Sequence, residues 1–178
     1  VTGWSTQIDI TAVSSYTNSS TCSGAVSGTL SNGSVTTGGG TLASGVGTFA
    51  GVSYTKTDTI YFKYTSGGLT LCGSTAITAA ASSTVSGVTL AVKSGSSSTI
   101  TADGSSTTIL EATVVDANNN LISGSSITLN IPSNGGTTTS PATTNGSGIA
   151  SFTLTSSTTA GTYAYTATGG SVTSSSTS

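Results

Sequence analysis

The sequence predicts an all-β protein made of two tandem β-sandwich domains. Short runs in which apolar and polar residues alternate recur along the whole chain, and none shows the 3.6-residue period of an amphipathic helix. Ser, Thr and Gly together make up more than half of the residues. Disorder is a poor explanation of this composition, because 34% of the residues are hydrophobic and the net charge is only −2. Thr favours strands, while Gly and Ser supply the turns between them.

Two series of strand-like runs define two predicted domains, residues 1–83 and 84–178. In the first series, residues 7–12 and 60–64 alternate. A fresh series begins after Ser82 and Ser83, and its runs present one apolar face each: Val88, Leu90 and Val92; Leu110, Ala112 and Val114; Ile127, Leu129 and Ile131; Ala150, Phe152 and Leu154; Tyr163, Tyr165 and Ala167. Turn clusters rich in Gly, Asn and Ser separate the runs. Half-buried strands at this spacing are typical of a sandwich.

Three motifs in the second half carry a resemblance to a known family. They are Ala102-Asp103-Gly104, Val114-Val115-Asp116, and the segment 144–150, which reads Thr-Asn-Gly-Ser-Gly-Ile-Ala. Over residues 86–170 the chain resembles the bacterial immunoglobulin-like (Ig-like) domains found in tandem in invasin and intimin. In the first half, residues 47–54 and 61–70 are similar to a related repeat of microbial surface proteins.

The resemblance implies two tandem Ig-like sandwiches on an extracellular cell surface. Such repeats are stalk and spacer modules of adhesins and surface assemblies, so they supply no catalytic residues to carry over to this chain.

The near absence of charge excludes several functions. Only 4% of the residues are charged, against about 25% in ordinary proteins. Three lysines cannot form the basic surface that nucleic acids require, and no apolar stretch approaches the roughly 18 residues of a membrane-inserted helix. Without histidine the chain also lacks the usual base for nucleophilic catalysis. We therefore expect no enzyme activity, no cofactor and no metal, and a stability that changes little with pH.

Two clusters of residues could carry a chemical function, and each also has a simpler structural interpretation. Residues 116–120, Asp-Ala-Asn-Asn-Asn, place oxygen ligands as a calcium loop does, but they lack its glycine and distal glutamate, which favours a hairpin turn. Lys93 and Glu111 together with an asparagine would suit an intramolecular isopeptide bond, if folding brought them together.

Cys22 and Cys72 are the only two cysteines, and they flank a strand-rich region. A disulfide between them is the favoured interpretation, and it would indicate an oxidising compartment. Two free buried thiols or half of a metal site are the alternatives, although the lack of histidine argues against a four-ligand zinc site within one chain.

Three asparagines are candidate carriers of N-linked glycans. Asn18, Asn32 and Asn145 each begin an Asn-x-Ser sequence in a turn-like segment. We expect these turns to be exposed, and at least one of them to be glycosylated if the source has the machinery.

The function predicted from the sequence is that of an extracellular structural subunit of a cell-surface filament. A nearly uncharged sandwich leaves its edge strands with little protection, which favours a homopolymer built by β-strand addition between copies. The proposed donor is the segment 1–13, in which Trp4, Ile8, Ile10 and Ala12 would be the anchoring residues, unless it is an ordinary first strand of its own domain. Other surface proteins or glycans are further possible partners.

Two other functions remain open from the sequence. One is a stalk or spacer fragment of a longer adhesin. The other is a carbohydrate-binding module, in which exposed aromatic residues would stack on sugars, with candidates Tyr16, Tyr54, Tyr61, Tyr163 and Tyr165. Most of these tyrosines alternate along strands and are therefore also candidates for the core.

Overall fold

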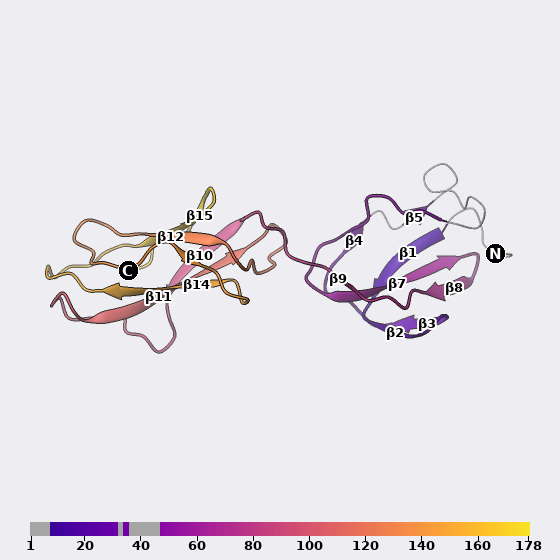
Figure 1. Cartoon of the computed structure of the whole chain (residues 1–178), viewed down its shortest axis with the longest axis horizontal. Coiled ribbons are helices and arrows are strands. Elements are labelled where there is room, and N and C mark those ends of the chain that lie inside the picture. Colours follow the sequence, from indigo (N-terminus) through magenta and orange to yellow (C-terminus); the bar gives the residue numbers. More distant parts are fainter. Residues whose placement is uncertain (1–7, 32–33, 36–46) are drawn as a thin grey trace. The chain divides into compact units, whose positions relative to one another are not determined.

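The structure, a computed structural model, describes residues 8–31, 34–35 and 47–178 (Figure 1). Its described part is built from strands, turns and loops, and it divides into two compact units, Val1–Ala80 and Ala81–Ser178. The predicted all-β fold class is confirmed. Within the described residues there is no helix of the length and hydrophobicity needed to cross a bilayer.

Unit 1, Val1–Ala80, contains one main antiparallel sheet in which the strands lie in the order β5-β1-β7-β8, with β9 also paired to β7. These strands are β1 (Ile8–Val13), β5 (Ser34–Val35), β7 (Thr59–Ser66), β8 (Leu69–Cys72) and β9 (Ile77–Thr78). Two smaller pairs accompany the sheet: β2 (Ser15–Asn18) with β3 (Thr21–Ser23), and β4 (Leu30–Ser31) with β6 (Ser53–Tyr54).

The long hairpin of β7 and β8 forms because Gly67 and Gly68 join the two strands. Both glycines have positive φ, 55° and 82°, as a tight two-residue hairpin turn requires. The apolar residues of β1 alternate as the sequence predicts, and Ile8 and Ile10 are buried. In β7, Ile60 is only 1% exposed. The sheet of unit 1 is thus built around β1 and β7, two paired strands that are far apart in the sequence.

Unit 2, Ala81–Ser178, is a sandwich of two antiparallel sheets. One sheet has the order β10-β11-β14, formed by β10 (Gly87–Val92), β11 (Thr107–Val115) and β14 (Ile149–Thr155). The other has the order β13-β12-β15-β16, formed by β12 (Ser126–Asn130), β13 (Ala142–Thr143), β15 (Thr166–Gly169) and β16 (Val172–Thr173).

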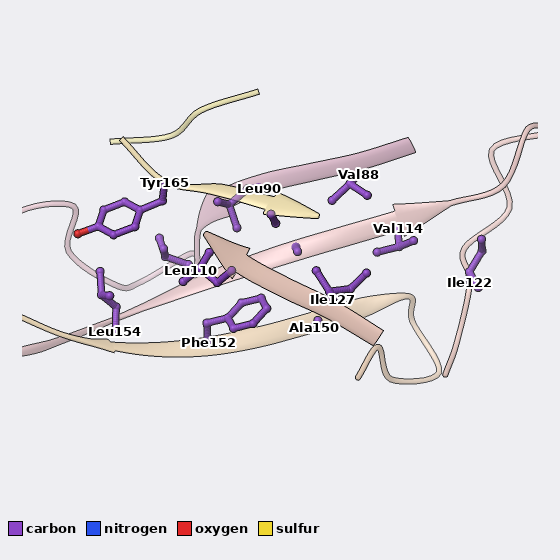
Figure 2. Packing of buried hydrophobic residues seen from close by; sticks show 13 residues of the cluster. Val88, Leu90, Leu110, Val114, Ile122, Ile127, Ala150, Phe152, Leu154 and Tyr165 are labelled. Carbon is purple, nitrogen blue, oxygen red and sulfur yellow. The ribbon is translucent and has the colours of Figure 1, made fainter. Parts of the chain in front are cut away.

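The core of unit 2 lies between these sheets (Figure 2). Alternate residues of β11 are buried along the whole strand, because successive side chains point to opposite faces of a sheet. Leu110, Ala112 and Val114 point into this core on the same face of the sheet as Phe152, the register partner of Leu110, as the alternation predicts. Phe152 is the largest of the side chains that are under 2% exposed. The apolar faces predicted for this unit therefore form one continuous core.

Candidate functional site

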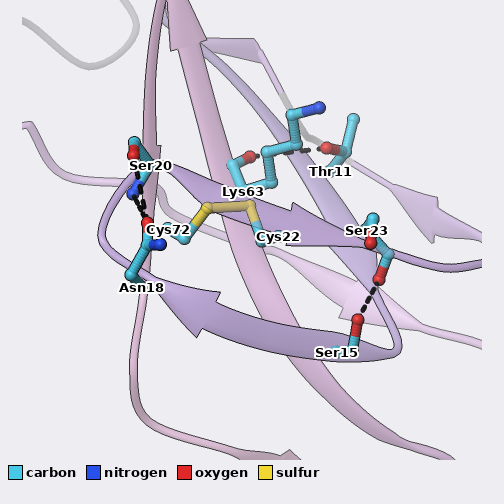
Figure 3. The surroundings of a disulfide bond; sticks show 8 residues. All are labelled: Thr11, Ser15, Asn18, Ser20, Cys22, Ser23, Lys63 and Cys72. Carbon is cyan, nitrogen blue, oxygen red and sulfur yellow. Dashed lines mark hydrogen bonds between the residues drawn. A yellow bond between two sulfur atoms is a disulfide. The ribbon is translucent and has the colours of Figure 1, made fainter.

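A disulfide joins Cys22 in β3 to Cys72 in β8, and it fixes the β2–β3 hairpin beside the main sheet of unit 1 (Figure 3). The two Cα atoms are 5.8 Å apart, and the bond closes a separation of 50 residues. Both cysteines are buried, and Val13 is buried in the same cluster. The bond settles the alternatives left open by the sequence: the described cysteines are neither free nor ligands of a metal.

Strand β8 is an edge of the main sheet, and it carries exposed leucines. Leu69 and Leu71 are 39% and 46% exposed. The backbone N–H of Gly73 points toward β7 and donates to Phe62 O. The backbone N–H of Cys72 points away from β7 and donates to Ser19 O at 2.8 Å. Because these directions alternate along a strand, the backbone groups of Thr70 also point away from β7. The β2–β3 hairpin covers the Cys72 end of this edge, so a further strand can pair with β8 only beyond that contact.

The predicted polymerisation segment falls partly within the described residues. Ile8, Ile10 and Ala12 belong to β1, which pairs with β5 on one side and with β7 on the other. Ile8 and Ile10 are buried and Ala12 is half-buried in this position. Trp4 lies outside the described residues. Within a single chain, β1 is thus a strand of its own unit.

Two of the three predicted glycosylation sites can be located, and both are exposed turns. Asn18 ends β2, and its Oδ1 accepts hydrogen bonds from the backbone N–H and the hydroxyl of Ser20 at 2.9 and 3.0 Å (Figure 3). Asn145 Oδ1 accepts hydrogen bonds from the backbone N–H groups of Ser147 and Ile149. Asn32 lies outside the described residues. In both located sites the asparagine and the following Ser sit in one short Asx turn on the surface.

The calcium-like segment that begins at Asp116 is a hydrogen-bonded turn. Asp116 is 2% exposed, and its Oδ1 accepts the backbone N–H groups of Asn118 and Asn120 at 2.8 and 2.9 Å. Its Oδ2 accepts the Asn120 side-chain amide and the backbone N–H of Ser82, both at 3.0 Å. Because N–H donors surround the carboxylate, this arrangement serves as a turn anchor, and the described residues contain no acidic, His or Cys cluster suited to a metal.

These donors determine the acidity of Asp116. Burial alone would raise its pKa, but the hydrogen bonds from Asn120, Ser82 and Asn118 outweigh burial and lower the pKa to about 2. The pKa of Asp103 is also lowered, chiefly by the backbone N–H groups of Ser106 and Ser105.

A third network of hydrogen bonds, this one in unit 1, surrounds the carboxylate of Asp58. The Tyr54 hydroxyl donates to its carboxylate, and Ser27 donates both its hydroxyl and its backbone N–H. These bonds, with that of Tyr54 the strongest, hold the pKa of Asp58 below its usual value. Three of the five acidic groups are thus stabilised in their charged form. We therefore expect stability to fall below about pH 4, where these groups are protonated in the unfolded chain but still charged in the fold.

Lys93 and Glu111 meet as the isopeptide hypothesis requires, but as an ion pair. Lys93 Nζ lies 3.3 Å from Glu111 Oε1, and the two side chains are 45% and 26% exposed. The Ser151 hydroxyl also donates to Glu111. The side-chain amides of Asn120 and Asn130 bind elsewhere, to Asp116 and to threonine hydroxyls of β15. A partly exposed ion pair of this kind contributes little to stability.

Comparison with known proteins assigns unit 2. Residues 92–178 match the family model of the bacterial Ig-like domain (group 1). Unit 2 is a bacterial Ig-like domain. The D0-D1 domain of intimin is a similar solved structure, with a TM-score of 0.37 and 15% sequence identity over 91% of this chain and 72% of that chain. No curated protein matches the sequence.

The structure explains two of the motifs from which the Ig-like domain was predicted. Gly148, in the segment 144–150, has a φ of 67°, and a Cβ atom there would lie 3.1 Å from Val114 O. A glycine lets the two backbones approach, so that Val114 N–H can donate to Gly148 O at 2.9 Å. Asp116, the last residue of the Val-Val-Asp motif, anchors the turn after β11. Both residues therefore serve the local structure around the end of β11.

The five candidate tyrosines for sugar stacking separate into two groups. In unit 1, Tyr16 and Tyr61 stack on each other with ring centroids 6.0 Å apart against the disulfide cluster, and Tyr54 is held by Asp58. In the Ig-like domain, Tyr163 and Tyr165 both line a cavity.

The sequence did not reveal the exposure of Leu69 and Leu71, because alternation does not say which strand will be an edge.

Proposed function

We propose that this chain is an extracellular structural subunit of a cell-surface filament, a homopolymer in which the N-terminal segment of one copy completes the sheet of the next. The observation that carries the proposal is the position of β1. Among the described strands it comes first, and it lies between β5 and β7, two strands that are distant from it in the sequence. Subunits of this kind perform no catalysis.

The contacts of β1 can be supplied equally well by a second copy. Residues 9–13 pair with residues 61–65 of β7, and Ile8 and Ile10 fill buried positions in the same sheet. Only Ser14 links β1 to β2. If β1 moves out, the identical strand of another copy makes the same pairs, so that exchange restores the contacts it breaks. Repeated in one direction, such an exchange produces an open polymer.

Composition and the disulfide support an extracellular location and self-association. The chain carries a net charge of −2 over 178 residues, and surfaces with so little charge associate readily. The bond between Cys22 and Cys72 suits an oxidising environment outside the cytoplasm. The bacterial Ig-like domain adds a module of the type found in surface proteins.

Strand exchange can be trapped with a pair of cysteines placed across β1 and β7. Asp9 and Thr65 are direct partners, so their Cα atoms lie about 5.5 Å apart or less, a distance that a disulfide spans. We expect the double variant Asp9→Cys, Thr65→Cys to give a ladder of covalent oligomers after polymerisation and oxidation, visible in non-reducing denaturing gels. An exchanged β1 forces each new bond to join two chains.

The matched control places the cysteines in unit 2. Thr89 and Thr113 are cross-strand partners in β10 and β11, and cysteines there should form bonds within one chain. If the Asp9 and Thr65 pair also gives only monomers while filaments are visible by electron microscopy, exchange of β1 is wrong, and addition at the β8 edge takes its place. A chain that stays monomeric under all assembly conditions would instead indicate a spacer fragment.

We also propose that Asn18 carries a glycan that shields the β8 edge. The hairpin turn containing Asn18 lies against this edge, since Cys72 N–H donates to Ser19 O at 2.8 Å. The edge lacks the lysine or proline that usually discourages unwanted pairing. In the natural protein, mass spectrometry of peptides should find glycan at Asn18 and at the exposed Asn145.

The role of the Asn18 glycan is tested separately from its presence. The variant Asn18→Gln should lose the glycan and form irregular aggregates faster than the wild type in light-scattering assays. The variant Asn145→Gln removes a glycan far in sequence from β8 and should aggregate at the wild-type rate. Equal rates for both variants would refute the shielding role.

A further inference from the structure

One end of the sandwich of unit 2 opens into a cavity of about 370 Å³. Its apolar part is formed by residues of the strands, including Leu110 and Leu154, which Figure 2 shows at the same end of the core as Tyr165. Its rim comes from the loop that follows β10 and from the segment between β14 and β15. A cavity of this volume is in the range of small-molecule sites.

The two tyrosines of the cavity are held in fixed positions. The Tyr165 hydroxyl donates to Gly135 O at 2.6 Å, and the Tyr163 hydroxyl donates to Thr159 O at 2.9 Å. Gly161 lies against the Tyr163 ring, since a Cβ atom there would be 3.2 Å from the ring. Both hydroxyls are therefore occupied, and the rings themselves remain as lining surface.

The cavity also carries hydroxyls, some of which, such as those of Thr108 and Ser156, are bonded within the chain, whereas others are available to a ligand. About half of the lining residues are Ser or Thr, and no lining side chain is charged. Among the described residues, the side chains of Ser98, Thr99 and Thr162 make no hydrogen bond within the chain. The cavity thus combines aromatic and aliphatic surface with uncharged groups that can both donate and accept hydrogen bonds.

We infer that this cavity binds a neutral saccharide. A sugar presents apolar C–H groups to an aromatic ring and hydroxyls to its surroundings, which matches both parts of the lining. A charged ligand would find no counter-charge, and a purely apolar one would leave polar groups without partners. The inference goes beyond filament assembly, because the site lies wholly in unit 2 and does not depend on β1.

The test is a titration of the full chain with three uncharged disaccharides: cellobiose, maltose and diacetylchitobiose. We expect heat or NMR shift changes with at least one of them. The variant Tyr163→Ala should weaken binding at least tenfold, whereas Tyr163→Phe keeps the ring and should retain it.

A second variant keeps the inference falsifiable if Tyr163→Ala fails to fold. Ala160 is an exposed lining residue, so Ala160→Trp should obstruct the cavity and weaken binding at least tenfold at an unchanged melting temperature. The matched control, Ala91→Trp, lies on the exposed side of β10 outside the cavity and should bind as the wild type does. Absence of binding to all three disaccharides at millimolar concentration, or equal binding by Ala160→Trp, would overturn the inference.

Two sources of the sugar can be distinguished by competition. The competitor added to the complex of chain and disaccharide is either the glycosylated chain or the enzymatically deglycosylated chain. If only the glycosylated chain displaces the disaccharide from the cavity, the ligand is a glycan carried by a neighbouring copy. If neither displaces it, the ligand is a polysaccharide from the surroundings.

Discussion

Removing the disulfide, in the double variant Cys22→Ala, Cys72→Ala, is expected to destabilise unit 1 by about 4 kcal/mol. The bond closes a separation of 50 residues, and in the chain-entropy view such a loop restricts the unfolded chain by roughly this amount. Unit 1 has little else to compensate, since the residues buried around the bond are few. The measurement is denaturant unfolding followed by the near-ultraviolet signal of its aromatic residues.

Unit 2 supplies the control within the same molecule. The described cysteines all belong to unit 1, so the unfolding transition of the bacterial Ig-like domain should keep its midpoint in the double variant. A transition of unit 1 that stays within about 1 kcal/mol of the wild type would show that the β2–β3 hairpin contributes little to its stability.

Substitution of Asp116 by alanine is expected to destabilise unit 2 by about 3 kcal/mol at pH 7, because buried N–H donors then lose their acceptor. The wild type should lose part of this stabilisation in acid. A carboxyl group whose pKa is lowered to about 2 stabilises the fold above its ordinary pKa near 4, and this contribution disappears as the pH falls through 2. Unfolding curves between pH 7 and pH 2 measure both effects, and the pH dependence of Asp116→Ala should be flatter.

Asp103 provides the comparison for this prediction. Its carboxylate also accepts several hydrogen bonds, from Ser105, Ser106 and Ser156, but it is exposed to solvent. Water can replace the carboxylate at those donors, so Asp103→Ala should destabilise unit 2 clearly less than Asp116→Ala does. Equal effects would mean that burial of Asp116 is not what makes its hydrogen bonds important.

Much of unit 2 could be predicted from the sequence, because its strands are long enough for alternation to be read. Leu110, Ala112 and Val114 were placed on one face by their spacing alone, and they lie in the core. In unit 1, by contrast, strands such as β4 and β6 contain two residues each, which is too short for a period to be visible.

Contacts between residues that are distant in the sequence could not be predicted from it. The carboxylate of Asp58 binds Ser27, which is 31 positions away, and no local sequence pattern predicts this contact. The exposure of Leu71 depends on the order of strands in the sheet, which is set by the complete fold. The cavity likewise exists only because loops from different parts of unit 2 meet at one end of the sandwich.

The pairing of β7 has a consequence for how unit 1 carries tension. The chain enters through β1, whose Asp9 lies opposite Thr65, and leaves through β9, whose Thr78 lies opposite Thr59 at the other end of β7. While β9 stays paired with β7, a pull on the two ends acts along the strands and loads the hydrogen bonds between β1 and β7 together, because these bonds run perpendicular to the strands. Such shear requires many bonds to break at once, whereas a peeling force breaks them one by one. A filament joined through this strand would share its load among all the bonds of each junction.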